Sequence, residues 1–250
     1  MQPTPSSTLA GPPIAIERET LDIVMPVYNE AATLADTVHA IAAATGPLVP
    51  FRFVIAEDPG QDHTTDVVTA LATAWPMVVT RATARRGYAR AMCDALAAST
   101  APYVLCVDSD GQYDPADIPR LWSERHHADI VSGLRQSRAE GALRRVGSRG
   151  FGLAVRLLFG VTTADPSSSF VLLRRSAVER VLPFLGSMPE AFWWDVSIRA
   201  MQHGLRVWEV PIHHHARAAG TTQVFRIGQL PFVAWRQVRG LLAIRFEAGR

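Results

Sequence analysis

The sequence alternates short runs rich in β-branched and aromatic residues with segments whose apolar residues recur at helical spacing. This alternation is typical of a mostly parallel sheet, because parallel strands are joined by crossover helices that cover both faces of the sheet. The sequence therefore predicts an α/β fold with such a sheet. The expected strands span residues 21–27, 51–56, 77–80, 103–107, 129–132, 170–173 and 207–212, and the expected helices 30–45, 66–74, 87–98, 142–159, 177–182 and 195–203.

The chain is expected to form one such domain, over residues 21–222. Its 250 residues, 48% of them hydrophobic, are enough for one large core and too apolar for a disordered protein. Residues 1–20 have no periodic apolar pattern and are interpreted as a flexible arm. Residues 223–250 form an amphipathic C-terminal segment, which could dock on the domain, pair with a second subunit in a homodimer or rest in a membrane interface.

Charge and cysteine content limit the surroundings of the protein. The net charge of +2 argues against a nucleic-acid partner. The sequence has no run of 18 uncharged apolar residues, so it predicts no spanning helix. Residues 1–20 contain no long apolar core and their first basic residue is Arg18, so they do not resemble a secretory signal. Cys93 and Cys106 cannot form a disulfide framework. We expect a cytoplasmic protein and leave open a peripheral contact at the cytoplasmic membrane face.

Acidic residues follow three of the expected strands. Because sites in such folds lie outside the carboxyl ends of the strands, these loops are the candidate site. Clustered carboxylates raise one another's pKa, and a bound cation relieves that repulsion. Oxygen ligands without His or Cys suit Mg²⁺ or Mn²⁺, whereas solvated turns are the alternative interpretation. The acids are Glu30 in the first loop, Glu57, Asp58 and Asp62 in the second, and Asp108, Asp110 and Asp114 in the third.

Three motifs in these loops resemble those of family 2 glycosyltransferases. Residues 25–30 (MPVYNE) resemble the family's P-V-Y-N-E opening, and residues 57–64 (EDPGQDHT) are similar to its D-D-G-S-x-D-G-T loop. Residues 108–115 (DSDGQYDP) resemble its D-x-D-x-Q-x-D-P element. The order and the gaps also fit, over residues 21 to about 225, and the closest likeness is to the dolichol- and polyprenyl-phosphate sugar synthases.

This resemblance implies a GT-A (Rossmann-like) fold and a nucleotide-sugar donor. It also implies roles for individual residues: Asp108 would face the ribose and the metal, and Asp110 and Gln112 would hold a divalent ion on the donor diphosphate. The metal set is therefore Asp108, Asp110 and Gln112. The nucleotide pocket would be lined by Pro26, Tyr28, Glu30, Glu57 and Asp58.

The second half of the chain resembles the family's phosphate-facing elements. Arg135 lies in a G-x-R element, and Arg145 and Ser148 lie where the lipid-phosphate contacts of the synthases would fall. Ser169 stands where the family's D-x-x-S-G segment has Gly, and it could bind phosphate or sugar or close a plain turn. Arg217, in an R-x-x-G-x-S-K-like element, is expected to clamp the diphosphate with its bidentate fork.

The sequence departs from the family pattern at several positions. Glu57 replaces an Asp, Pro59–Gly60 replaces Gly-Ser, and Arg85–Gly87 replaces Asn-x-Gly. Gln223 stands where the synthases have Lys, so one cation at the reacting phosphate is missing. The run His213–His215 has no flanking ligands close in sequence, and we do not expect a transition metal there.

We expect an inverting, metal-dependent glycosyltransferase that moves a hexose to a polyprenyl phosphate, with Asp110 and Arg217 as catalytic groups. An ionised phosphate acceptor needs no general base. The alternative is a soluble hydroxyl acceptor with Asp195 as the base, although an N-cap role for Asp195 is an equal interpretation. A non-catalytic nucleotide-sugar-binding module is the third hypothesis.

Overall fold

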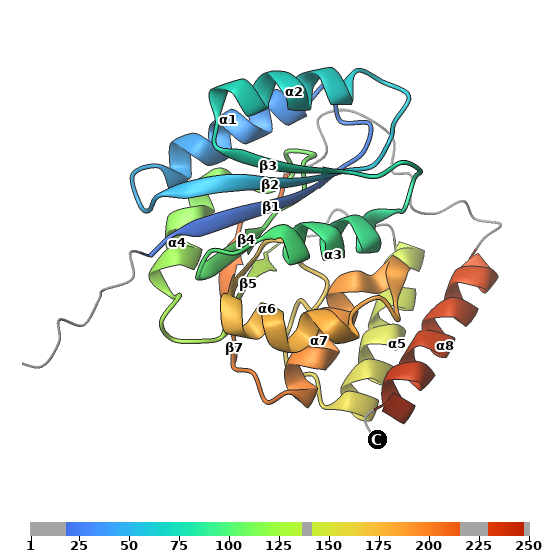
Figure 1. The fold of residues 1–250 in the computed structure, drawn as a ribbon. Helices are drawn as coiled ribbons and strands as arrows, with labels where there is room; N and C mark the ends of the chain where they lie inside the picture. The colour runs from blue at the N-terminus through green and yellow to red at the C-terminus, as the bar shows by residue number, and fades with distance from the viewer. Residues whose placement is uncertain (1–18, 137–141, 216–229, 248–250) are drawn as a thin grey trace, which may run out of the picture.

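Seven strands form one mixed sheet in the order β3-β2-β1-β4-β6-β5-β7. The structure is a computed structural model, and it describes residues 19–136, 142–215 and 230–247, without the side chains of 142–149, 230 and 231 (Figure 1). The strands are β1 (Leu21–Val27), β2 (Phe51–Glu57), β3 (Met77–Arg81), β4 (Tyr103–Cys106), β5 (Ile130–Arg135), β6 (Val171–Arg174) and β7 (Val207–Ile212). The helices are α1 (Leu34–Thr45), α2 (Thr64–Ala74), α3 (Tyr88–Ala98), α4 (Ile118–Ser123), α5 (Ala142–Phe159), α6 (Arg175–Val181), α7 (Phe192–Gln202) and α8 (Leu230–Glu247).

The direction of the strands gathers the loops at one edge of the sheet. β1 pairs in parallel with β2 and β4, β2 with β3, and β5 with β7. β6 runs antiparallel to its neighbours β4 and β5. The edge that carries the carboxyl ends of β1, β2, β4, β5 and β7 therefore also carries the start of β6. The motifs in the loops after β1, β2 and β4 fall at this edge, as does the G-x-R element at the end of β5.

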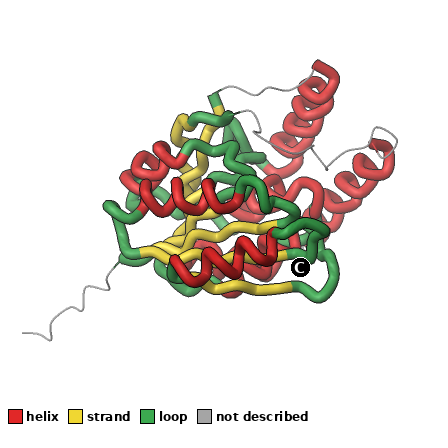
Figure 2. Tube along the Cα trace, turned by 90° about the horizontal axis from the view of Figure 1, so that it is seen from above, coloured by secondary structure: helices red, strands yellow, loops and turns green. Residues whose placement is uncertain are grey.

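Helices cover both faces of the sheet (Figures 1 and 2). Alternate residues of one strand enter different cores, as the pleat requires: Ile23 packs under α1, α2 and α4, and Val24 packs under α3, α6 and α7. A third apolar cluster lies beyond the sheet, where Val155 of α5 and Ile244 of α8 meet Ile198 of α7. The α/β architecture predicted from the alternation is confirmed.

The boundaries of two helices differ from those expected. The first helix begins at Leu34 and not at Glu30, because Asn29 has a positive φ of 53° and the residues that follow form a turn. The helix expected from Asp195 begins at Phe192, one turn earlier. α8 is apolar on both sides: Leu241 and Ile244 are buried, while Trp235 is exposed on another side of the helix.

The edge of the sheet away from the site holds an ion pair between the buried Asp22 and the partly exposed Arg52. The Asp22 carboxylate accepts hydrogen bonds from the Arg52 guanidinium, at 2.7 and 3.1 Å, and from the amides of Thr100 and Ala101. Burial opposes the ionisation of Asp22, but these donors outweigh it and lower the pKa of the carboxyl below its usual value. This pair makes folding stability depend on pH.

We expect the free energy of unfolding to fall as the pH drops below about 4. A carboxyl with a lowered pKa in the folded state stabilises the fold above its unfolded pKa, and this contribution is lost as the pH falls through the folded pKa. Arg52→Met should weaken this dependence, measured by urea unfolding from pH 3 to 7. Arg206→Met is the control, because Arg206 is exposed and lies 3.8 Å from Asp129. Equal pH slopes for wild type and Arg52→Met would contradict the assignment.

Candidate functional site

The loop after β1 is fixed by contacts to the two neighbouring loops. The hydroxyl of Ser109 donates to the Pro26 carbonyl at 3.0 Å, and the Glu30 amide donates to Thr64 at 2.9 Å. The guanidinium of Arg85 lies 3.9 Å from the centre of the Tyr28 ring, a cation–π contact. The arginine that replaces the family's Asn thus covers a residue predicted to face the nucleotide.

Two of the three acids of the second loop, Glu57 and Asp58, are buried and held by donors. Glu57 forms an ion pair with Arg81 at 2.8 Å and accepts a short hydrogen bond from Thr65. Asp58 accepts the amides of Arg86 and Gly87 at 3.0 and 2.7 Å, which fastens the loop before α3. A cleft of about 410 Å³ adjoins these residues and runs between the ends of β2 and β3 and α3, a volume within the usual range for small-molecule sites.

Gly60 marks the closest approach of the first two loops. A Cβ built on Gly60 would lie 2.1 Å from Oδ1 of Asn29, the same oxygen that accepts the Gln61 amide. We expect Gly60→Ala to lower the free energy of unfolding by about 1–3 kcal/mol, because either the loop or Asn29 must shift. Urea unfolding checks this, with Gly150→Ala as the control, since a Cβ there meets nothing within 4 Å. Equal losses in the two variants would contradict the clash.

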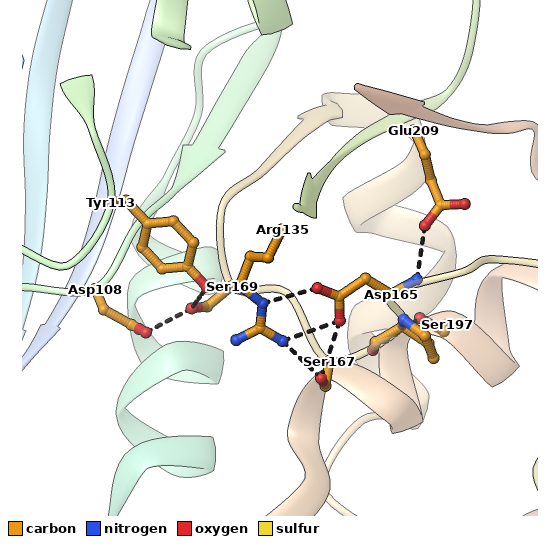
Figure 3. Close-up of polar contacts among 9 residues, drawn as sticks. Asp108, Tyr113, Arg135, Asp165, Ser167, Ser169, Ser197 and Glu209 are labelled. Carbon is orange, nitrogen blue, oxygen red and sulfur yellow. Dashed lines mark hydrogen bonds and ion pairs between the residues drawn. The ribbon is translucent and has the colours of Figure 1, made fainter. Parts of the chain in front are cut away.

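Asp108, the first acid after β4, accepts hydrogen bonds from two hydroxyl groups. Tyr88 donates to its Oδ1 at 2.9 Å, and Ser169 donates to its Oδ2. The Tyr88 oxygen in turn accepts the indole N–H of Trp193 at 2.8 Å. Figure 3 shows Ser169 between Asp108 and Tyr113, whose hydroxyl lies 2.9 Å from that of Ser169. Residues of α3, α7 and the start of β6 therefore orient this one carboxylate.

Asp110 and Gln112 lie in a turn that is tied to the segment after β7. The buried Asp110 accepts the backbone amide of Gln112 at 3.1 Å. The Gln112 side-chain nitrogen donates to the His215 carbonyl, and the His215 amide donates to the Gln112 carbonyl at 2.8 Å. The hydrogen bond to the His215 carbonyl uses the side-chain nitrogen of Gln112. The predicted metal contact would instead use the side-chain oxygen of Gln112.

The electrostatics of this turn favour a cation. Burial and the neighbouring Asp110 charge raise the pKa of Asp108 to about 6, despite the hydrogen bonds from Ser169 and Tyr88. Two carboxylates and an amide oxygen are the donor set of Mg²⁺ or Mn²⁺. Among the described side chains, no group of three or more His, Cys, Asp or Glu could hold a metal. Any metal here would therefore rely on Asp108, Asp110, the Gln112 amide and oxygens of a ligand.

Arg135 is locked into a polar network at the end of β5 (Figure 3). Its fork donates to both oxygens of Asp165, at 2.7 and 2.9 Å, and to the Ser167 hydroxyl. Glu209 of β7 accepts the backbone amide of Asp165 at 2.8 Å, which holds that carboxylate in turn. The sequence predicted a phosphate contact for Arg135, and the structure shows an arginine whose position is set by an acid.

Asp195 lies in the first turn of α7 in a fully buried position. Its Oδ2 accepts the amides of Gly186, Ser187 and Met188, at 3.0 to 3.3 Å. Its Oδ1 lies 3.4 Å from Nε of Arg199 and has no hydrogen bond. Burial raises the pKa of Asp195 above its usual value, although the three amides and Arg199 act in the opposite direction. In this conformation Asp195 closes a loop and contacts no solvent.

Three of the predicted site residues lie outside the part of the chain whose side chains the structure describes. Arg217 is not among the described residues, and Arg145 and Ser148 lie in α5, in the part whose side chains are not described. The histidine run is in part described: His213 contacts Asp117, and His215 lies 3.4 Å from Asp114. These pairs tie the end of β7 to the turn that follows Asp110.

The sequence analysis did not predict the roles of Tyr88 and Trp193 in orienting Asp108. Tyr88 follows Gly87 directly after the β3 loop, so its place near the carboxyl edge was a usable signal. Trp193 had no such signal, because a tryptophan in a helix is most often a core residue. Nor did any sequence feature point to Glu209, which lies within β7 and contacts Asp165 only through the fold.

The chain is similar to known proteins both in sequence family and in individual relatives. A match to Glycosyl transferase family 2 covers residues 22–182. The chain is 31% identical over 168 residues to the undecaprenyl-phosphate 4-deoxy-4-formamido-L-arabinose transferase of Pseudomonas paraeruginosa, covering 66% of this chain and 50% of the relative. It is 25% identical to the transferase of the same name from Yersinia enterocolitica, covering 81% and 62%. The chain thus spans less than two thirds of the length of these relatives.

Solved structures share the fold at lower identity. Glucosyl-3-phosphoglycerate synthase from Mycobacterium tuberculosis, solved with Mn²⁺, uridine diphosphate and glucosyl-3-phosphoglycerate, superposes with a TM-score of 0.65 at 20% identity, over 91% of this chain and 80% of the other. Mannosyl-3-phosphoglycerate synthase from Rubrobacter xylanophilus gives a TM-score of 0.63 at 15% identity, over 93% and 75%. These neighbours place the chain in the GT-A fold, as predicted.

Proposed function

Because this chain belongs to glycosyl transferase family 2, and is therefore a glycosyltransferase, we propose that it transfers a sugar from a nucleotide-sugar to a polyprenyl phosphate. The relatives named for an undecaprenyl-phosphate acceptor support the acceptor class. The single observation that carries the donor half is the meeting of the acidic loops after β1, β2 and β4 at one edge of the sheet. Through Glu57 and Asp58, the second of these loops also borders the cleft of about 410 Å³ beside α3.

The nucleotide would bind where the first two acidic loops meet. Tyr28 presents a ring held by Arg85, and Glu57 and Asp58 border the cleft. Their carboxylates are fixed by Arg81 and by the amides of Arg86 and Gly87, so they are already oriented when the donor arrives. Pro26 and Glu30 would complete this pocket from the loop after β1.

The donor diphosphate would lie against Asp108, Asp110 and Gln112. A bound Mg²⁺ or Mn²⁺, as in the fold neighbours, would stabilise the negative charge that develops on the leaving diphosphate. Asp108 and Asp110 would hold the ion, and the hydrogen bonds from Tyr88 and Ser169 would keep Asp108 oriented for it. Arg217 would add a bidentate contact to the diphosphate, and Arg135 supplies fixed positive charge near Asp108. The anomeric carbon would be attacked from the opposite side, with inversion.

The acceptor would be an ionised phosphate that attacks without a general base. The burial of Asp195 supports this, since that carboxylate cannot reach an acceptor from the conformation described. Arg145 and Ser148 are proposed as the acceptor-phosphate contacts, and Ser169, beside Asp108, as a sugar or phosphate contact. The proposed reaction thus combines a donor in the cleft, a cation at the turn after β4 and an acceptor that is already anionic.

The test is an assay of the purified chain with radiolabelled nucleotide-sugars, a short-chain polyprenyl phosphate and Mn²⁺ or Mg²⁺. A lipid-linked sugar, absent when the metal is chelated, is the expected product. A soluble hydroxyl acceptor that takes the sugar while polyprenyl phosphate does not would overturn the acceptor. Nucleotide-sugar binding with neither transfer nor slow hydrolysis would identify a binding module instead.

Tyr88 provides a sharper test of how Asp108 is held. We expect Tyr88→Phe to lower kcat/KM about tenfold, because Asp108 loses one hydrogen bond and the Trp193 indole loses its acceptor. Steady-state kinetics across metal concentrations should also show a raised metal requirement. Tyr103→Phe removes a hydroxyl at the opposite edge of the sheet and should leave both values unchanged. Equal losses in the two variants would contradict a role for Tyr88 in positioning Asp108.

A further inference from the structure

Two neighbouring helices turn large apolar side chains toward solvent. α5 and α8 lie at the same end of the molecule (Figure 1), and both pack on α7 through the third cluster. On α5, Leu153 and Leu157 are one helical turn apart, and Leu157 is 78% exposed. On α8 the exposed apolar residues, spaced three or four apart, form a stripe on the side away from the core: Phe232, Trp235, Val238, Leu242 and Phe246. We call the exposed residues of α5 and α8 the outer face.

The outer face carries positive charge along with its apolar residues. The Arg239 guanidinium lies 5.7 Å from the centre of the Trp235 ring, and that of Arg236 lies 5.7 Å from the Phe232 ring and forms an ion pair with Glu190 at 2.9 Å. Arg245 is also exposed on α8. The sequences of the two helices hold one acid, Glu247, which pairs with the buried Arg199. Aromatic and aliphatic side chains interleaved with arginines, and with no unpaired acid among the described side chains of the two helices, are typical of helices that rest in a membrane interface.

We propose that the outer face docks on a bilayer that contains anionic lipids, with the apolar side chains of α5 and α8 in the acyl boundary and the arginines on the headgroups. A second copy of the chain is a poorer occupant, because a two-fold contact would bring two positively charged faces together. Anionic headgroups complement that charge. No described helix is long and apolar enough to span a membrane, so the contact lies in the interface.

The choice of a bilayer rests in part on the proposed function, because a polyprenyl phosphate resides in a membrane. α5 follows β5 and α8 follows β7, and both strands end at the edge of the sheet that carries the site. The docking surface and the chemistry are nevertheless separate properties and can fail separately.

Co-sedimentation with vesicles tests the docking without any donor or acceptor. We expect the full chain to bind phosphatidylglycerol–phosphatidylcholine vesicles and to bind pure phosphatidylcholine vesicles more weakly. The triple variant Leu157→Gln, Trp235→Gln, Phe246→Gln should lose at least tenfold in affinity for both vesicles, because each exposed apolar group contributes through burial. The pair Arg239→Gln, Arg245→Gln should lose about tenfold on anionic vesicles only.

The matched control is Trp208→Gln, which removes an exposed tryptophan from β7 and should bind vesicles like wild type. Far-UV circular dichroism verifies that each variant is folded. Wild-type binding that the triple variant retains would overturn the proposal. So would a wild-type dimer that ignores vesicles and becomes monomeric in the triple variant, since a second copy would then cover the outer face. Vesicle binding without sugar transfer would refute the proposed acceptor and leave the docking surface intact.

Discussion

Asp110→Asn is expected to reduce turnover by about two to three orders of magnitude while leaving the fold intact. The side chain lies in the turn after β4, buried beside Asp108, and the turn itself is held by the hydrogen bond from the Gln112 amide, which Asn can still accept. What Asn cannot supply is the negative charge that, under the proposed function, would hold a dication on the leaving diphosphate, where stabilisation of the developing charge is usually the largest catalytic contribution. Initial rates at saturating nucleotide-sugar measure the loss.

The matched control for this substitution is Asp66→Asn. It makes the same chemical change at an exposed position on α2, where Asp66 contacts only His63 among its described partners. Turnover should not change in this control. If Asp110→Asn kept wild-type turnover, or if its turnover fell with no change in the metal concentration that gives half the maximal rate, Asp110 would not be a metal ligand.

Asp195→Ala is expected to lower the free energy of unfolding by about 3 kcal/mol. The substitution removes the acceptor of three backbone amides in the loop before α7, and it leaves the buried Arg199 with Glu247 as its acidic partner. Urea unfolding at neutral pH measures the change. The control is Asp36→Ala, which removes an exposed carboxylate from the first turn of α1 and should cost well under 1 kcal/mol. A loss for Asp195→Ala no greater than in this control would contradict a structural role.

Asp195→Asn then separates the two acceptor hypotheses. Asn keeps an oxygen for the loop amides, and an ionised phosphate acceptor needs no base, so the folded variant should turn over within a few-fold of wild type. A hydroxyl acceptor that depends on Asp195 would instead lose orders of magnitude in kcat. Such a loss would also require Asp195 to leave the buried position described here.

The sheet and the acidic loops could be predicted from the sequence because they depend on local patterns. A short run rich in apolar and β-branched residues, such as the one from Leu21 to Val27, predicts a strand from its own residues, without knowledge of the neighbouring strands. The rule that sites lie at carboxyl ends then brings Glu57 and Asp108 to one edge without knowledge of the packing. The family resemblance follows from the same loops, and the match over residues 22–182 confirms it.

Contacts between segments far apart in the chain could not be predicted from local sequence patterns. Nothing near Arg135 in the sequence indicates that its fork is held by Asp165, because that pair depends on how β5 and β6 align. The same holds for Tyr88, which meets Asp108 only because α3 packs across β1 and β2. The expected division into residues 1–20, 21–222 and 223–250 stays a prediction, as do the roles given to Arg145, Ser148 and Arg217.

The reversed strand β6 has a consequence for how the protein is made. β5 has no pairing with β4 and joins the sheet only through β6, which the ribosome delivers more than thirty residues later. Asp108 belongs to the early half of the sheet, whereas Arg135 and Ser169 are carried in with the late insertion. Asp108 therefore gains the Ser169 hydroxyl and the nearby charge of Arg135 only once β6 has been inserted between β4 and β5.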